Sequence, residues 1–101
     1  MKNKKLNPVH LGKNLEEDLM IPLGVTKYRL AKDIHVSPRR INEMVKGKRA
    51  VSANTALRLS RYFGNSAKFW LNLQAQYDLE VEEDKMTDKL DAIIKPYKDA
   101  A

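Results

Sequence analysis

The sequence predicts an all-α fold of five helices followed by one further helical segment. Apolar residues recur with helical periodicity along most of the chain, and no stretch alternates apolar and polar residues as a half-buried strand does. Helix boundaries are also marked, because a serine or threonine precedes four of the predicted helices and a glycine follows three of them. With 101 residues, 43% of them hydrophobic, the chain has the size of a single domain with a modest core.

We expect helices over residues 10–22, 26–34, 37–46, 52–63 and 66–80, to within about 2–4 residues at each end. The predicted N-caps are Thr26, Ser37, Ser52 and Ser66, and the predicted C-terminal glycines are Gly24, Gly47 and Gly64. A last amphipathic segment covers about 84–95. Before it, the acidic residues 79–88 either extend the fifth helix or form a loop. Residues 1–7 are expected to be a flexible, basic N-terminus.

The charge of the chain is unevenly distributed. Residues 1–64 contain 14 basic and 5 acidic residues, a net charge of +9, whereas residues 65–101 contain 5 basic and 8 acidic residues, a net charge of −3. Such a basic region attracts phosphate groups, although ordinary solvated surfaces carry similar charge. The chain has no cysteine for disulfides or metal sites, and no apolar stretch suited to a membrane span or signal peptide. These features favour a cytoplasmic location.

Residues 26–46 are the most informative part of the chain, because they predict two short helices joined by a tight turn. Apolar side chains of the two helices face each other, and Ala31 is small where the helices must approach closely. His35 occupies the turn position that needs a left-handed backbone, where histidine is enriched among non-glycine residues. This is the arrangement of a helix-turn-helix, whose second helix enters the DNA major groove.

The outward stripe of the second helix carries Arg39, Asn42, Glu43 and Lys46 at i, i+3, i+4 and i+7. Arg39 can donate two hydrogen bonds to guanine, Asn42 can pair with adenine, and Glu43 can accept from cytosine N4. Arg40 flanks the stripe and suits either a base or a phosphate. Phosphate contacts are expected on both sides of the groove, from Thr26, Lys27, Arg29, Lys46, Lys48 and Arg49.

Simpler interpretations stay open for these residues and for the aromatic cluster. Exposed charged residues are ordinary on small helical bundles, and Arg40 with Glu43, or Asn42 with Lys46, can pair on the surface. The fifth helix has an apolar face that belongs either to the core or to a dimer seam, and a ligand pocket is less favoured. The candidates for this face are Phe69, Trp70, Leu73 and Tyr77.

An enzyme is the main competing class of function. The chain has two histidines, His10 and His35, and it shows no Ser/His/Asp set, no metal-ligand spacing and no phosphate-binding glycine loop. We therefore expect neither catalysis nor a cofactor. RNA binding would place stacking aromatic residues among the basic ones, where the sequence offers only Tyr28.

Three phrases of the sequence, RRINEMVKGKR, TALRLSRYFG and FWLNLQ, are dense and specific. Through them, residues 26–64 resemble the Cro/C1-type, XRE-like helix-turn-helix domain, and residues 15–79 are similar to antitoxins of the HigA/VapI type. The resemblance covers about two thirds of the chain. The family's His-Pro-Gly at the head of the first helix reads His10-Leu11-Gly12 here, so the motif does not define where that helix begins.

The resemblance implies a lambda-repressor-like DNA-binding domain over residues 8–80, with its helix-turn-helix at 26–46, and a C-terminal helical extension over 81–101. It also implies a homodimer that binds double-stranded operator DNA, represses its own toxin–antitoxin operon, and neutralises a small RelE/HigB-like ribonuclease toxin by direct binding. The alternative is a stand-alone XRE-type repressor without a toxin partner. By position in the family motif, base readout falls on Pro38, Arg39, Arg40, Asn42 and Glu43.

Overall fold

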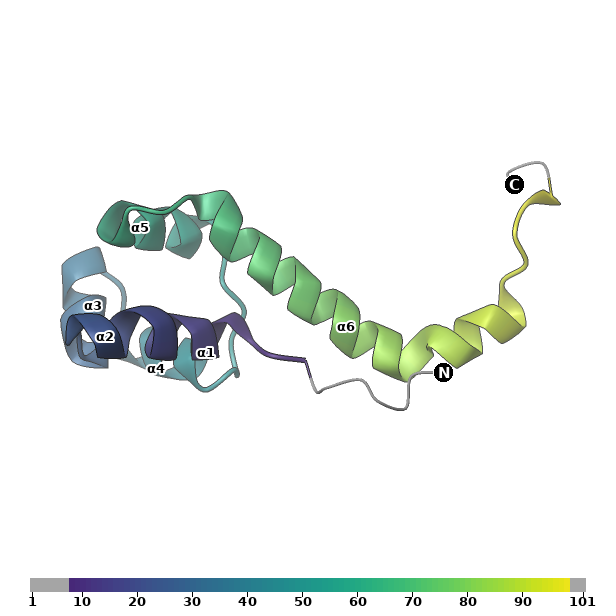
Figure 1. Cartoon of the computed structure of the whole chain (residues 1–101), viewed down its shortest axis with the longest axis horizontal. Helices are drawn as coiled ribbons and strands as arrows, with labels where there is room; N and C mark the ends of the chain where they lie inside the picture. Colours follow the sequence, from purple (N-terminus) through teal and green to yellow (C-terminus); the bar gives the residue numbers. More distant parts are fainter. Residues whose placement is uncertain (1–7, 99–101) are drawn as a thin grey trace.

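The computed structural model describes residues 8–98, and every regular element in this range is a helix (Figure 1). The first helical run consists of α1 (Leu11–Asn14), a π-helical stretch η1 (Leu15–Met20) and α2 (Ile21–Leu23). Helices α3 (Lys27–Ile34), α4 (Pro38–Val45), α5 (Ala53–Phe63) and α6 (Ala67–Ile93) follow. The predicted all-α fold is confirmed, while the predicted flexible N-terminus, residues 1–7, lies outside the described residues.

Side-chain caps define the starts of four helices, as the sequence predicts. Each cap oxygen accepts a hydrogen bond from the backbone N–H three residues later, at 3.0, 3.1, 3.2 and 3.0 Å for Thr26, Ser37, Ser52 and Ser66 respectively. His35 has the predicted left-handed conformation at the turn, with a φ of 61°. Positive φ angles also occur at the three predicted glycines, Gly24, Gly47 and Gly64.

The first helical run begins at Leu11 because His10 caps it. The Nδ1 atom of His10 accepts a hydrogen bond from the N–H of Gly12 at 2.9 Å. The run continues to Leu23 through the π-helical turns, in which the N–H of Ile21 bonds to the carbonyl of Glu16. The imidazole of His10 therefore sets the start of this helix, which the family motif left undefined. The observed start at Leu11 agrees with the predicted range of 10–22.

Helix α6 joins the fifth predicted helix to the last predicted segment, so the acidic residues 79–88 are helical rather than a loop. Residues 65–95 contain no glycine or proline that would interrupt the helix. The helix ends where Ile94 becomes extended, with φ −106° and ψ 118°, two residues before Pro96.

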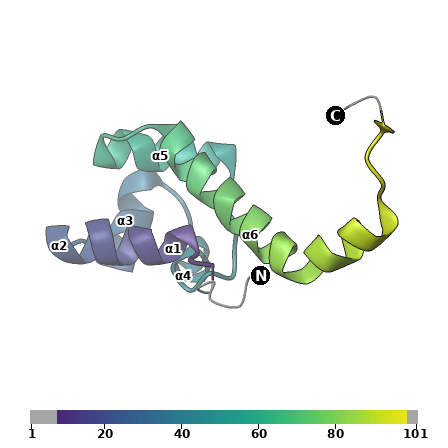
Figure 2. The same ribbon diagram turned by 45° about the vertical axis from the view of Figure 1, so that its right-hand side comes forward.

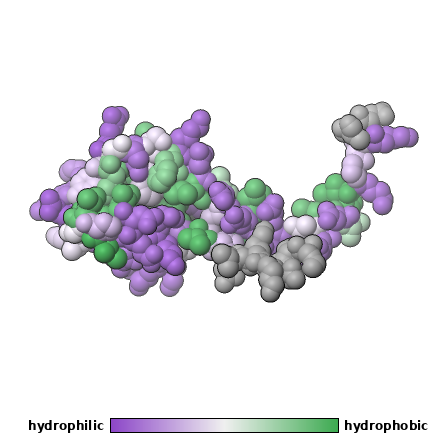
Figure 3. Space-filling view, viewed as in Figure 1, coloured by the Kyte–Doolittle hydropathy of each residue, from purple (hydrophilic) through white to green (hydrophobic). Residues whose placement is uncertain are grey.

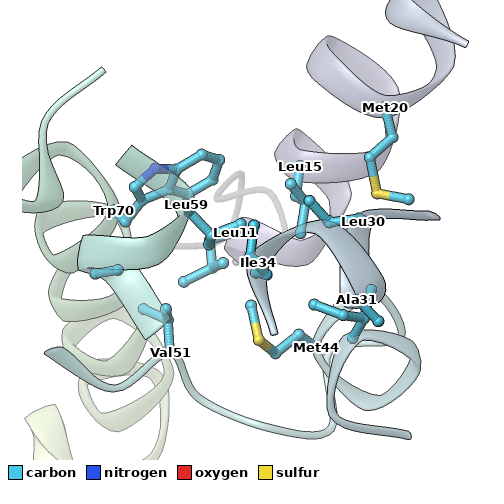
Figure 4. Close-up of a cluster of buried hydrophobic side chains, with 12 residues drawn as sticks. Leu11, Leu15, Met20, Leu30, Ala31, Ile34, Met44, Val51, Leu59 and Trp70 are labelled. Carbon is cyan, nitrogen blue, oxygen red and sulfur yellow. The ribbon is translucent and has the colours of Figure 1, made fainter. Parts of the chain in front are cut away.

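A single apolar core collects side chains from the whole bundle (Figure 4). Trp70 is fully buried in it, and its indole Nε1 donates a hydrogen bond to Oδ1 of Asn65 at 2.9 Å. Leu73 packs against the core, whereas Tyr77 is partly buried and Phe69 is 44% exposed. The face predicted as core or dimer seam is thus core at Trp70 and becomes more exposed away from it. The other largest fully buried side chains are Leu11, Leu15, Leu30, Ile41, Met44, Thr55 and Leu59.

The C-terminal half of α6 projects from the domain (Figures 1 and 2), which makes the molecule 53 Å long against 28 and 21 Å in the other directions. The first half packs against α5 and α1. Leu79, Leu90 and Ile93 are exposed on α6. The helix beyond its packed first half therefore carries apolar side chains that its own domain leaves uncovered.

Candidate nucleic-acid interface

The inner face of α4 anchors this helix on the domain. Ile41 and Met44 are fully buried, and α4 packs against α3 and α1. The approach of α1 requires a glycine, because a Cβ on Gly12 would lie 1.9 Å from the carbonyl oxygen of Met44 and 2.9 Å from Cα of Val45. Gly12 therefore determines how closely α4 sits on the first helical run, and it is not among the predicted site residues.

The outer face of α4 presents the predicted reading residues. Pro38 is exposed at the first helical position, and the side chain of Arg39 is 84% exposed. Asn42 is partly buried, and its Oδ1 accepts a hydrogen bond from Nζ of Lys27 at 3.3 Å, which links α3 to α4. Lys46 is exposed at the C-terminal end of the helix. The structure thus brings the predicted stripe together on one accessible face.

Glu43 lies on this face between two arginines. Its Oε2 accepts a hydrogen bond from Nε of Arg39 at 3.1 Å, and its Oε1 accepts from Nε of Arg49 at 2.8 Å. Hydrogen bonds from Arg49 and then Arg39 hold the pKa of Glu43 below its ordinary value, so Glu43 is a carboxylate at neutral pH. The surface ion pairs of Glu43 therefore involve Arg39 and Arg49 rather than Arg40, the partner that the sequence left open.

Arg40 contacts α5 in this structure. Its Nη1 donates a hydrogen bond at 3.4 Å to Oγ1 of Thr55, which also accepts from Oγ of Ser52 at 3.2 Å. Thr55 is buried, so this contact joins the first turn of α4 to the first turn of α5. The guanidinium of Arg40 thus supports the seating of the reading helix on the domain.

The basic loop after α4 is fastened to α6 by Gln74. Lys48 and Arg49 are exposed on this loop, and the N–H of Val51 at its end donates to Oε1 of Gln74 at 2.9 Å. The amide Nε2 of Gln74 in turn donates to Oδ1 of Asp78 at 2.9 Å. A buried amide satisfied in this way holds the loop in one position. Gln74 is not among the predicted site residues, although its position four residues after Trp70 places it on the inward face of α6.

The start of α3 holds the remaining predicted phosphate contacts, and Arg29 is paired there with Asp33, which in turn contacts α5 through Tyr62. Nε of Arg29 donates to Oδ2 of Asp33 at 2.7 Å, and the hydroxyl of Tyr62 donates to the same oxygen at 2.6 Å. The Tyr62 hydroxyl, followed by Arg29, lowers the pKa of Asp33, while the bond to Asp33 raises the pKa of Tyr62. Thr26 is exposed at the N-cap, and Lys27 reaches Asn42.

Arg58 on α5 holds the turn between the two helices of the helix-turn-helix. Its Nη1 donates to the carbonyl oxygens of Ile34 at 2.8 Å and His35 at 3.3 Å, and its Nε donates to Oδ1 of Asn54 at 2.7 Å. These bonds satisfy carbonyl groups at the end of α3, where the helix itself offers no donor. No local pattern in the sequence indicates this role of Arg58, because its partners lie 23 and 24 residues earlier in the chain.

His10 joins α1, the basic loop and α6. Its ring packs edge-on against Tyr77, with ring centroids 4.8 Å apart and an interplanar angle of 75°. Burial lowers the pKa of His10, an effect partly opposed by the charge of Asp78 and by a hydrogen bond with the Arg49 backbone. The neutral imidazole therefore serves both as the cap of α1 and as a packing surface for α6.

The surface of the domain body has both hydrophilic and apolar areas (Figure 3), as the exposed Ile21, Leu23 and Leu57 illustrate. Residues 38–52 carry five basic residues and one acidic residue. Figure 3 shows hydrophilic side chains gathered over the lower part of the body, the side on which Figure 1 labels α4, and apolar side chains on the projecting arm. None of the helices within residues 8–98 is both long and apolar enough to cross a membrane.

Comparisons with known proteins identify relatives with this architecture. Residues 17–70 match the model of a helix-turn-helix family. The chain is 50% identical over 80 residues to virulence-associated protein I of Dichelobacter nodosus, an alignment that covers 78% of this chain and 74% of that protein. An addiction module antidote protein of the HigA family from Coxiella burnetii has a TM-score of 0.86 at 35% identity, covering 91% of this chain and 100% of that one.

The Pseudomonas aeruginosa antitoxin HigA, whose structure contains the higBA promoter, also has a TM-score of 0.86, at 34% identity over 88% of this chain and 97% of that one. Proteins of this kind bind DNA and are not enzymes, which confirms the prediction that this chain is not an enzyme. The chain belongs to the XRE-like helix-turn-helix family, in the branch that contains the HigA antitoxins and virulence-associated protein I.

Proposed function

We propose that this chain is an antitoxin that binds operator DNA and represses its own toxin–antitoxin operon. The observation that carries the proposal is the geometry of α4, whose inner face is fixed by Ile41 and Met44 while Arg39, Asn42 and Glu43 share its outer face. A helix held in this way fits the major groove, where these three residue types read guanine, adenine and cytosine. The promoter in the structure of the P. aeruginosa HigA relative supports DNA as the partner.

The phosphate contacts in this proposal come from both sides of α4. Lys27 at the start of α3 lies on one side, and Lys46, Lys48 and Arg49 follow α4 on the other. Thr26 adds a helix N-terminus, whose N–H groups favour an anion. Arg29 stays a predicted phosphate contact, although it is bound to Asp33 in the free protein.

We propose that two copies of the chain bind the operator together. The projecting arm of α6, which includes most of the predicted extension over 81–101, exposes Leu79, Leu90 and Ile93. A second copy fits this exposed apolar stripe, because a two-fold arrangement lets the same apolar side chains of both copies cover one another. A two-fold dimer implies a pseudo-palindromic operator, with reading helices about 34–36 Å apart.

The dimer is tested by measuring the molar mass in solution by light scattering. We expect a dimer for the wild type and a folded monomer for Leu90→Asp combined with Ile93→Asp, because both changes place charge on the exposed stripe. The substitution Lys95→Asp, at an exposed residue after the end of α6, is the control and should leave the dimer intact. A monomeric wild type, or a double variant that stays dimeric, contradicts this assignment of the arm.

The second part of the proposal is that the chain neutralises a RelE/HigB-like ribonuclease toxin by direct binding. It is supported by the relatives, since the C. burnetii protein is an addiction module antidote and the P. aeruginosa protein is an antitoxin. The alternative, a stand-alone XRE-type repressor, uses the same α4 geometry, so DNA binding does not discriminate between the two.

Co-expression discriminates between these alternatives. The tagged chain is expressed together with the open reading frame that lies next to its gene, and cell growth and co-purification are measured. Rescue from a growth-inhibiting neighbour, together with a stable complex, supports the antitoxin. A harmless neighbour and an unaccompanied chain favour the stand-alone repressor.

DNA binding is tested with a labelled fragment from upstream of the chain's own gene and a shuffled fragment of equal composition. Arg39→Ala should lose about 1–3 kcal/mol on the upstream fragment and much less on the shuffled one. Arg61→Ala, an exposed position on α5, is the control for the lost charge. Equal losses on both fragments would assign Arg39 to a phosphate, and a wild type without preference for the upstream fragment would refute operator binding.

A further inference from the structure

Glu43 is the one acidic residue among residues 38–52, where five basic residues surround it. A carboxylate on a DNA-binding face repels phosphate and weakens the general attraction of that face for DNA. Glu43 is only partly buried, with 26% of its side chain exposed, so burial in the core does not account for it. Its contacts indicate instead how it acts when DNA approaches.

The two carboxylate oxygens of Glu43 are held with unequal strength. Oε1 contacts both Nε and Nη2 of Arg49, each at 2.8 Å, and the main chain of Glu43 also accepts a hydrogen bond from the N–H of Lys48 at 2.8 Å. Oε2 has one longer contact, 3.1 Å from Nε of Arg39, whose side chain is almost fully exposed. Exposed single pairs are weak, so the contact with Arg39 breaks first and the contact with Arg49 persists.

We infer that Glu43 is a specificity-determining residue that disfavours DNA other than the operator, an inference that rests on the proposed function. When Arg39 exchanges its hydrogen bond with Glu43 for one with a guanine, Oε2 of Glu43 faces the groove without a donor. The major-groove edges offer it hydrogen-bond donors only at the amino groups of cytosine and adenine, and their other polar atoms are acceptors. A site that places an amino group there satisfies Oε2, and a site that places an acceptor there repels it.

The same carboxylate lowers what Arg39 gains from a phosphate of non-operator DNA. As long as Oε2 has no donor in the groove, a move of Arg39 to a phosphate leaves this carboxylate unpaired, so the phosphate contact stabilises the complex less than it would without Glu43. Glu43 therefore acts mainly through a penalty on incorrect sequences, which is a common route to specificity. Loss of its charge should strengthen non-specific binding while it weakens discrimination.

The test is Glu43→Gln, which keeps the shape of the side chain and can still accept a hydrogen bond from Arg49. Affinity is measured for the upstream fragment and the shuffled fragment at several salt concentrations. We expect tighter binding to shuffled DNA, with a salt dependence steeper by about one unit, because the released Arg39 neutralises one more phosphate. The ratio of the two affinities should fall by about tenfold or more, the size of one base contact.

Two further variants separate this role from simpler ones. Glu17→Gln, at an exposed position of η1, removes the same charge and should leave the ratio unchanged. Combining Glu43→Gln with Arg39→Gln should remove the added salt dependence on shuffled DNA. The inference would be overturned if Glu43→Gln left the ratio of the two affinities unchanged, or if it weakened binding to both fragments equally and lowered the melting temperature. Neither result would affect the proposed binding of the operator by the wild type. A wild type without sequence preference would overturn the proposed function as well.

Discussion

The substitution Gly12→Ala tests the close approach of α1 to α4. The added Cβ would lie 1.9 Å from the carbonyl oxygen of Met44 and 2.8 Å from its carbonyl carbon, whereas an ordinary contact begins at 3.4 Å. Both obstructing atoms belong to the backbone of α4, so no side-chain rotation removes the overlap. The two helices must therefore move apart, and α4 must shift on the domain.

Two energetic effects of Gly12→Ala oppose each other. Alanine in a helix is favoured over glycine by about 1 kcal/mol. Overpacking a core costs about 1–3 kcal/mol, and the upper end applies here because separation also loosens the fully buried Leu11, Leu15 and Met44. The steric effect wins, and we expect the free energy of unfolding to fall by about 2 kcal/mol. For a domain of this size that is a melting temperature lower by roughly 8–16 °C.

Thermal and urea unfolding followed by circular dichroism measure this loss. Lys13→Ala is the matched control, because Lys13 is the exposed neighbour in the same helix and its replacement should change stability by less than about 0.5 kcal/mol. The folded fraction of Gly12→Ala should also bind the upstream DNA fragment less tightly, since α4 is displaced. A Gly12→Ala protein as stable as Lys13→Ala would refute the steric argument.

Three further predictions concern the basic loop and its supports. Lys48→Ala should weaken binding to upstream and shuffled DNA alike and reduce the salt slope by about one unit; an unchanged slope would exclude a phosphate contact. Gln74→Leu leaves the buried N–H of Val51 without an acceptor and should lower the free energy of unfolding by about 1–3 kcal/mol; urea unfolding at the stability of the wild type would contradict this. Burial lowers the pKa of His10 below 6.5, so the unfolded state binds the proton more tightly than the folded state. The contribution of His10 to the free energy of unfolding is therefore fully present above pH 6.5 and decreases as the pH falls below that value. His10→Asn, which keeps a capping side chain, should flatten this decrease in urea unfolding measured from about pH 5 to 7, and an equally steep decrease would show that another group titrates.

Helix boundaries were predictable because their causes are local. The hydroxyl of Ser37 accepts a hydrogen bond from a backbone N–H three residues later. The left-handed turn requires a residue that tolerates a positive φ angle, and His35 is such a residue. The continuity of α6 was harder to predict, since the acidic residues 79–88 weaken the apolar period although nothing in the backbone stops the helix there. A helix shows a regular apolar period where one of its faces is buried against a core. This part of α6 packs against no core, so its sequence shows no such period.

The candidate site likewise has features with local causes, which were predictable, and features that depend on distant contacts, which were not. Periodicity alone placed Arg39, Asn42 and Glu43 on one stripe, and the structure brings them to one accessible face. The engagement of Arg40 with Thr55, 15 residues away, is not visible in any local pattern. The sequence therefore predicted which side chains share the face, and the fold decided which of them are tied to the domain in the free protein.

Sequence by itself determined the helical class, the starts and turns of the helices, the composition of the reading stripe and the family resemblance, because each depends on neighbours within one or two helical turns. Tertiary structure decided the need for Gly12 against Met44, the anchoring of the basic loop by Gln74 across 23 positions, and the capping of α3 by Arg58 across 24. The reason is physical: these contacts join elements whose approach is determined by the packing of the whole core, and no periodicity along the chain encodes that distance.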